Sequence, residues 1–287
     1  MTIWASITVI LVILAGIFIW HMRKPGPPPV MRFAYDIPEN QQFLPLAMNF
    51  NLPVLVVSPD GKYFVYSTMN GIYLRSVGEL TATLIAGTEE PAMQSFFSQD
   101  GKMIAYISFQ DRKFKKISIN GRAPVNICDI TSLPVGGYWD SEDSILFGQN
   151  NGPIMRVSAN GGTPEPVAGA KSEDHLFPRI LPGGEYLMYT ADVENPRVLV
   201  LSLKSGKTRE LFAGYDAQYL PTGHIIYRLD DTNNLYAVPF DLDSLETTAV
   251  LAQITIFLSS SLFGIPDKRK ARLVQSPTRA RSAGLEP

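Results

Sequence analysis

The chain has few side chains that could act as a nucleophile or a general base: one cysteine and three histidines among 287 residues. The cysteine, Cys128, lies in the apolar stretch Val125 to Ile130. A reactive thiolate needs a neighbouring base or cation, and no histidine is close to Cys128 in the sequence. The sequence therefore predicts that Cys128 is a small buried hydrophobic residue rather than a nucleophile.

His175 follows two acidic residues, Glu173 and Asp174, and this triplet is the best candidate for a metal site. A protein metal site usually needs three or four converging ligands. The triplet supplies only a partial set, and His21 and His224 are far away in the sequence. We therefore expect no metal site and no cofactor. The triplet is expected to be a solvated loop, with a ligand contact as the alternative.

An internal repeat of about 40 residues must position these side chains. Five segments share one order, in which a short apolar run leads into a turn and two strands follow about ten residues apart. The last residues of the five turns are 40, 43, 40 and 39 positions apart. The turns are Ser58–Gly61, Ser98–Gly101, Ser141–Ser144, Leu181–Gly184 and Leu220–Gly223.

The residue types in these turns are typical of β-hairpins. Glycine adopts the positive φ of a tight turn without steric cost, and aspartate can bond to its own backbone. A preceding proline sets the bend in advance. The residues predicted to hold the turns are Asp60, Gly61, Asp100, Gly101, Asp143, Gly183, Gly184 and Gly223.

Four short strands in each repeat correspond to one blade of a β-propeller. A two-sheet sandwich would also contain many strands, but it would not produce this regular spacing. A sixth turn is due near position 263, where only Ser261–Gly264 is found. The predicted fold is all-β: a β-propeller of about five visible four-stranded blades, with an incomplete six-bladed ring as the alternative, preceded by one transmembrane helix.

Residues Ser58 to Lys62 read Ser-Pro-Asp-Gly-Lys and precede an apolar strand that contains tyrosine. This pattern resembles the TolB-type, WD-like propeller repeat, over residues 51 to about 250. It is most similar to the C-terminal propeller regions of bacterial membrane Ser/Thr kinases, and Leu220–His224 and Val238–Asp241 resemble that subgroup too. The resemblance implies a propeller of six or more blades outside the cytoplasm.

No catalytic motif of a kinase occurs in the chain: it has no Gly-rich phosphate loop, no His-Arg-Asp and no Asp-Phe-Gly. A prolyl-peptidase-like hydrolase would need a Gly-x-Ser-x-Gly elbow and about 200 further residues. We therefore expect a non-catalytic binding or sensing module. The alternatives are an orphaned sensor region of a receptor-type Ser/Thr kinase and a propeller fragment of such a hydrolase.

A ligand site is expected at the mouth of the propeller channel, where the loops before the innermost strands converge. These loops are acidic and aromatic. They are expected to bind a protein or peptide partner, or a cationic ligand. The predicted contact residues are Glu90, Asp174, His175, Tyr215 and Asp216.

A membrane anchor is predicted at the N-terminus. Ile3 to Trp20 is eighteen residues without a charge, enough for a helix of about 27 Å. Trp4 and Trp20 lie at its ends, where aromatic rings favour the membrane interface. We expect a retained anchor over 1–22 and a Pro-rich linker over 23–30, with a cleaved signal peptide as the alternative.

The orientation in the membrane rests on two opposing indications. The basic flank of His21, Arg23 and Lys24 favours a cytoplasmic propeller. The family resemblance implies the opposite side, and we expect a single-pass protein with an extracytoplasmic propeller over 31–252. Its repeats are expected near 51–90, 91–133, 134–173, 174–213 and 214–252.

The formal net charge of −2 combines a basic tail with an acidic body. From Asp267 onward there are six basic and two acidic residues, so the rest of the chain carries −6. Nucleic-acid binding needs Lys and Arg on the folded surface, so we expect no nucleic-acid partner. The tail, 253–287, is expected to be irregular and disordered.

Overall fold

The structure is a computed structural model that describes residues 35–41, 43, 55–168, 173–191, 194–229 and 235–247, and the backbone of 252–254. The chain divides into two compact units, Met1–Ile37 and Pro38–Pro287, and only the second is considered below. Within the described ranges, no helix is long and apolar enough to cross a membrane. The predicted anchor, the linker and the tail beyond Ile254 lie outside these ranges.

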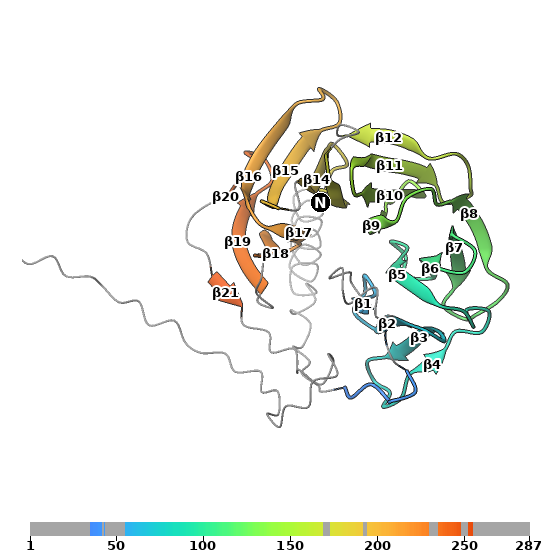
Figure 1. The fold of residues 1–287 in the computed structure, drawn as a ribbon. Coiled ribbons are helices and arrows are strands. Elements are labelled where there is room, and N and C mark those ends of the chain that lie inside the picture. Colours follow the sequence, from blue (N-terminus) through green and yellow to red (C-terminus); the bar gives the residue numbers. More distant parts are fainter. Residues whose placement is uncertain are drawn as a thin grey trace, which may run out of the picture. The chain divides into compact units, whose positions relative to one another are not determined.

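The second unit consists of antiparallel groups of strands, here termed blades 1 to 5, that follow one another in sequence order, with four strands in each of blades 1 to 4 and five in blade 5 (Figure 1). Blades 1 and 2 comprise β1 (Leu55–Val57), β2 (Tyr63–Thr68), β3 (Gly71–Ser76), β4 (Thr83–Leu84), and β5 (Ala92–Phe97), β6 (Met103–Ser108), β7 (Lys113–Ser118), β8 (Val125–Asp129). Blades 3 and 4 comprise β9 (Pro134–Trp139), β10 (Ser144–Gln149), β11 (Gly152–Ser158), β12 (Glu165–Ala168), and β13 (His175–Ile180), β14 (Tyr186–Ala191), β15 (Arg197–Ser202), β16 (Thr208–Ala213). Blade 5 comprises β17 (Tyr215–Leu220), β18 (His224–Arg228), β19 (Leu235–Asp241), β20 (Glu246–Thr247) and β21 (Ala252–Ile254), and both β20 and β21 pair with β19.

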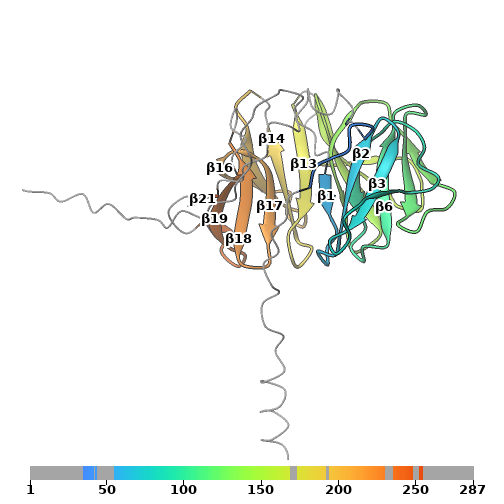
Figure 2. The ribbon, with the colours of Figure 1, turned by 90° about the horizontal axis from the view of Figure 1, so that it is seen from below.

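The blades surround a common centre, and the first strand of each blade is innermost (Figure 1). From β1 to β17, each innermost strand contacts the next. The strands run between two ends of the unit (Figure 2). The end with the β1–β2 turn and its equivalents is termed the turn end, and the end where β5, β9, β13 and β17 begin is the mouth end. The predicted all-β class and the four-stranded antiparallel sheets are confirmed.

An aromatic residue at the fourth position of the second strand forms the core of each blade. These residues expose 5% of their surface or less: Tyr66, Tyr106, Phe147, Tyr189 and Tyr227. Burying an aromatic ring this completely contributes about 1.5–3 kcal/mol. In blade 1, Tyr66 packs edge-on against Phe43, with ring centroids 6.2 Å apart, and donates a hydrogen bond to Gln41. Residues ahead of β1 therefore help to cover the first blade.

Every turn at the turn end between a first and a second strand has a left-handed residue at its fourth position. The φ values are 70° at Gly61, 70° at Gly101, 60° at Asp143, 77° at Gly184 and 77° at Gly223. The third turn is therefore Asp140–Asp143, one residue before the predicted Ser141–Ser144. Aspartate tolerates the left-handed region better than most residues, and Trp139 Nε1 donates a hydrogen bond of 2.9 Å to Asp143.

A bulge interrupts the innermost strands of blades 2 to 5 near the mouth end, where the register shifts. The bulged residue has a positive φ in each case: Gln94, Gly136, Phe177 and Asp216. A Cβ added to Gly136 would lie 2.7 Å from the Cα of Phe177, so glycine is required there. Bulges change the direction of side chains. These four bulges therefore determine the direction in which the side chains at the start of each innermost strand point.

Candidate functional site

All five predicted contact residues lie at the mouth end. Glu90 lies two residues before β5, and Asp174 lies one residue before β13. His175 is the first residue of β13, and Tyr215 and Asp216 are the first two residues of β17. The expectation that His175, Tyr215 and Asp216 lie in loops is wrong. Both strands keep their pairing with the following strand up to their first residue.

Glu90 is bonded inside its own blade. Its carboxylate accepts hydrogen bonds from Lys115 Nζ at 2.8 Å, Ser108 Oγ at 2.6 Å and Tyr106 Oη at 3.3 Å. Burial alone would lower the pKa of Lys115, but hydrogen bonds to Asp111 and Glu90 outweigh burial and raise it. Burial, supported by the charge of Glu90, raises the pKa of Tyr106. The charge of Glu90 is therefore already compensated.

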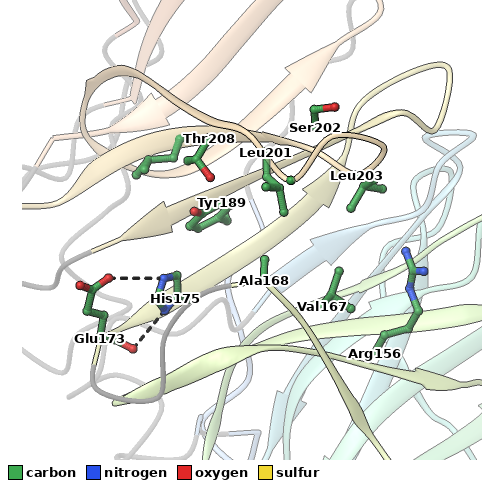
Figure 3. Close-up of a pocket in the computed structure, with 12 residues that line it drawn as sticks. Arg156, Val167, Ala168, Glu173, His175, Tyr189, Leu201, Ser202, Leu203 and Thr208 are labelled. Atoms are coloured by element: carbon green, nitrogen blue, oxygen red, sulfur yellow. Dashed lines mark hydrogen bonds and ion pairs between the residues drawn. The ribbon is translucent and has the colours of Figure 1, made fainter.

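His175 is buried, with 3% of its surface exposed, so the expected solvated loop is wrong at this residue. Its Nδ1 lies 3.1 Å from the carbonyl oxygens of both Gly152 and Glu173, and its ring centroid is 5.5 Å from that of Tyr189. The neighbouring Asp174 accepts a hydrogen bond of 2.7 Å from the backbone of Asn151. The imidazole thus faces a groove between blades 3 and 4 (Figure 3).

Tyr215 and Asp216 form a compact cluster with Arg228 at the start of blade 5. The Arg228 guanidinium lies 4.4 Å from the Tyr215 ring centre and 3.2 Å from the Asp216 carboxylate. The Tyr215 ring is 6.4 Å from that of Phe177 on β13. The Asp216 backbone donates a hydrogen bond of 3.1 Å to Thr190 Oγ1. The cluster therefore also connects blades 4 and 5.

Arg179, on the innermost strand β13, is a cation that the sequence analysis did not identify. Its Nη1 donates hydrogen bonds of 2.9 Å to the carbonyl oxygens of Gly137 and Pro178, and its guanidinium lies 5.8 Å from the Tyr138 ring centre. Burial lowers the pKa of Arg179, and the charge of Asp216 opposes this. The available signal was a single arginine in the otherwise largely apolar strand that begins at His175.

Burial raises the pKa of the Cys128 thiol to about 11, so Cys128 is uncharged near neutral pH. Among the residues that the structure describes, no group of three or more His, Cys, Asp or Glu side chains is arranged to hold a metal ion. Two of the acidic side chains at the mouth end are paired with cations, Glu90 with Lys115 and Asp216 with Arg228.

No family model and no curated protein matches the chain in sequence. Many solved structures match in fold. A putative TolB from Agrobacterium tumefaciens is 14% identical, with a TM-score of 0.55 over 68% of this chain and 78% of that chain. A chain of the nidogen/laminin complex has the same identity and TM-score, over 68% of this chain and 77% of that chain.

Two further solved structures are also similar in fold. TolB from Acinetobacter baumannii is 14% identical, with a TM-score of 0.55 over 67% of this chain and 53% of that chain. The oligogalacturonate lyase from Vibrio parahaemolyticus is 10% identical, with a TM-score of 0.51 over 70% and 64% of the two chains. Such low identities concern the fold alone, and they give no link to a kinase. The chain thus has a β-propeller fold similar to those of TolB and the nidogen/laminin complex.

Proposed function

We propose that this chain is a non-catalytic, membrane-tethered β-propeller that binds a protein or peptide partner at its mouth end. One observation carries the proposal: this end exposes apolar side chains beside acidic residues that are already paired. Met69 and Phe109 follow β2 and β6 at equivalent turns of blades 1 and 2, and they are 45% and 49% exposed. Methionine and aromatic residues are enriched at protein interfaces.

The pairing of the acids favours a protein partner over a cationic ligand. Glu90 already binds Lys115, and Asp216 already binds Arg228. A cationic ligand would have to compete with these internal cations, which are held at fixed positions. A protein partner would instead gain by covering Met69 and Phe109, since removing apolar surface from water is favourable without new charges.

Photo-crosslinking tests the location of the partner surface. A photoreactive phenylalanine analogue replaces Met69 or Phe109 in the full chain, and as a control Leu80, which is 88% exposed in the β3–β4 turn at the opposite end. We expect the same partner to be crosslinked at Met69 and Phe109 and not at Leu80. Equal crosslinking at all three positions, or at Leu80 alone, would contradict the proposal.

Once a partner is identified, substitution measures the contribution of the apolar pair. Met69→Asp combined with Phe109→Asp is expected to weaken binding by at least about tenfold, because loss of two exposed apolar contacts removes more than about 1.4 kcal/mol. The melting temperature should change little, because both side chains are already half in solvent. Leu80→Asp is the matched control and should leave the affinity unchanged.

The proposal includes a single-pass anchor over Ile3–Trp20 with the propeller outside the cytoplasm. The uncharged length of that segment supports the anchor. A reporter enzyme that becomes active only outside the cytoplasm, fused after Pro287, tests the orientation. An active reporter is expected, and an inactive reporter on a membrane-bound fusion would refute the proposed orientation.

A further inference from the structure

A groove of about 650 Å³ lies between blades 3 and 4, away from Met69 and Phe109 (Figure 3). Its walls combine polar and apolar groups, and the apolar ones include Val167 on β12 and Leu201 and Leu203 from blade 4. Two polar groups mark its ends. Arg156 lies at one end, and Glu173 with His175 lies at the other (Figure 3).

Arg156 differs from the equivalent cation of the preceding blade. Lys116 and Arg156 occupy the same position, opposite the third residue of the second strand in blades 2 and 3. Lys116 donates a hydrogen bond of 3.1 Å to Asn160 and lies 6.0 Å from the Trp139 ring centre. The Nε of Arg156 is buried and has no hydrogen-bond partner among the described residues. A buried donor without an acceptor is unfavourable, and no described residue would compete with a ligand for this guanidinium.

The acidic residue nearest in register does not neutralise Arg156. Glu165 is its Cα partner on β12. However, Glu165 does not line the groove, and no ion pair joins the two side chains in the described structure. Arginine remains charged at neutral pH, so this end of the groove is suited to a carboxylate.

The other end of the groove has the opposite character. The Glu173 carboxylate is 69% exposed and lies 3.8 Å from His175 Nε2. His175 occupies a position that is Ala92 in blade 2 and Pro134 in blade 3, so the imidazole adds a polar group where the other blades have a small or apolar residue. This end is suited to a cationic or hydrogen-bond-donating group.

The separation of the two ends follows from strand geometry. His175 Nδ1 lies beside the Gly152 carbonyl, and Arg156 is four residues further along β11. At about 3.3 Å per residue the two ends are about 13 Å apart. An extended segment of about four residues spans this distance. Leu201 lines the groove and packs in one core cluster with the buried Ile154 of β11.

We propose that this groove binds an extended peptide of about four residues that carries a carboxylate at the Arg156 end, apolar side chains in the middle and a basic group at the Glu173 end. The charge complementarity, the length and the apolar leucine and valine side chains between the two ends all fit this class of ligand. The inference does not depend on the mouth-end proposal, because the two surfaces share no residue used in either experiment.

The probe is a random heptapeptide display library, selected against the full chain in detergent micelles. We expect enriched sequences to carry an acidic and a basic residue three or four positions apart, with apolar residues between them. Hydrogen exchange of the full chain with an enriched peptide should show protection in Gly152–Ser158 and Arg197–Ser202 and none in Tyr215–Leu220. Failure to enrich this class, or protection confined to Tyr215–Leu220, would overturn the proposal.

Matched variants test the role of the cation. Arg156→Met should weaken an enriched peptide by at least about tenfold, because a charge-assisted hydrogen bond is lost. Lys116→Met is the control and should leave the affinity unchanged. Arg156→Glu should shift the selection toward peptides with a basic residue at that end. Equal affinity for Arg156→Met and Lys116→Met, or an unchanged selection with Arg156→Glu, would contradict the assignment.

Discussion

The two ends of the blades bond their acidic side chains in different ways. At the turn end, Asp60 accepts hydrogen bonds from Ser58 Oγ at 2.7 Å and from the backbone of Lys62 at 3.1 Å, all within one turn. Asp100 repeats this pattern in blade 2. At the mouth end, Glu90 is bonded to residues 16 to 25 positions further along the chain. The carboxylates of Asp60 and Asp100 are thus held by local bonds, whereas that of Glu90 is held by tertiary ones.

This difference separates turns whose bonding can recur from blade to blade from a surface whose bonding varies between blades. A local bond can recur in each blade because it needs nothing from a neighbouring blade. The bonds at the mouth end differ from blade to blade. The Glu90 carboxylate binds Lys115 on β7, whereas the Asp216 carboxylate binds Arg228 and the Asp216 backbone N–H donates to the hydroxyl of Thr190 in blade 4. Such variation gives each sector of the mouth its own chemistry, which is what recognition of a partner requires.

The largest expected effect comes from a glycine at the mouth end. Gly71 has a φ of 131°, and an added Cβ would lie 2.3 Å from the backbone oxygen of Thr88. Gly71→Ala must therefore strain the backbone and move the loop before β5. We expect the free energy of unfolding to fall by about 4 kcal/mol, measured by urea unfolding of the full chain in micelles.

Gly61 at the turn end is the matched control. It also has a positive φ, 70°, but an added Cβ would meet nothing within 4 Å. Gly61→Ala should cost only the backbone strain, about 1 kcal/mol. If the two substitutions destabilise the chain equally, close packing does not distinguish the mouth end from the turn end.

The second comparison concerns two lysine–carboxylate pairs. The Lys115–Glu90 pair at the mouth end is 2.8 Å long, with side-chain exposures of 9% and 13%. Lys115→Met leaves the Glu90 carboxylate without its cation, and we expect a loss of about 3 kcal/mol. Lys62 and Asp60 at the turn end are 73% and 46% exposed. Lys62→Met should cost less than about 0.5 kcal/mol, and a loss comparable with that of Lys115→Met would remove the distinction.

The repeat could be predicted from the sequence because its signals are local. The Asp-Gly turns at Asp60 and Asp100 contain in four residues the groups that bond one another. The third turn was misplaced by one residue because Asp140 and Asp143 stand where the first two turns have serine and glycine. A sequence pattern built on residue type does not recognise such substitutes.

The candidate site was only partly predictable, because its partners are distant in sequence. Glu90, Tyr215 and Asp216 were identified from their place in the repeat, but the cations that pair with them come from other strands. The burial of His175 depends on Tyr189 and on the β10–β11 turn. Neither contact can be predicted from the residues next to His175 in the sequence. Arg179 can be recognised there only as an isolated charge in a strand.

A smaller effect is expected from Asp143, which tests how interchangeable the turns are. Asp143→Gly relieves the left-handed backbone but loses the bond from Trp139 Nε1, so the two changes of about 1 kcal/mol each should nearly cancel. Asp143→Ala loses the bond and keeps the strain, and it should destabilise the chain by about 1 kcal/mol. Urea unfolding of both variants checks this order. A strongly destabilised Asp143→Gly would mean that the third turn is not equivalent to the others.

The smallest effect is the pH dependence of a turn-end carboxylate. The hydrogen bond from Ser58, supported by that from the Lys62 backbone, lowers the pKa of Asp60 from 3.8 to about 2. A group whose pKa is lower in the folded chain stabilises the fold above its unfolded pKa, and the stabilisation is lost as the pH falls through the folded pKa. Asp60→Asn should therefore be less stable than the parent chain at pH 6, and the difference should shrink between about pH 4 and pH 2. Urea midpoints at pH 6, 4 and 3 measure this, and a difference that stays constant with pH would show that the turn does not hold the ionised form of Asp60.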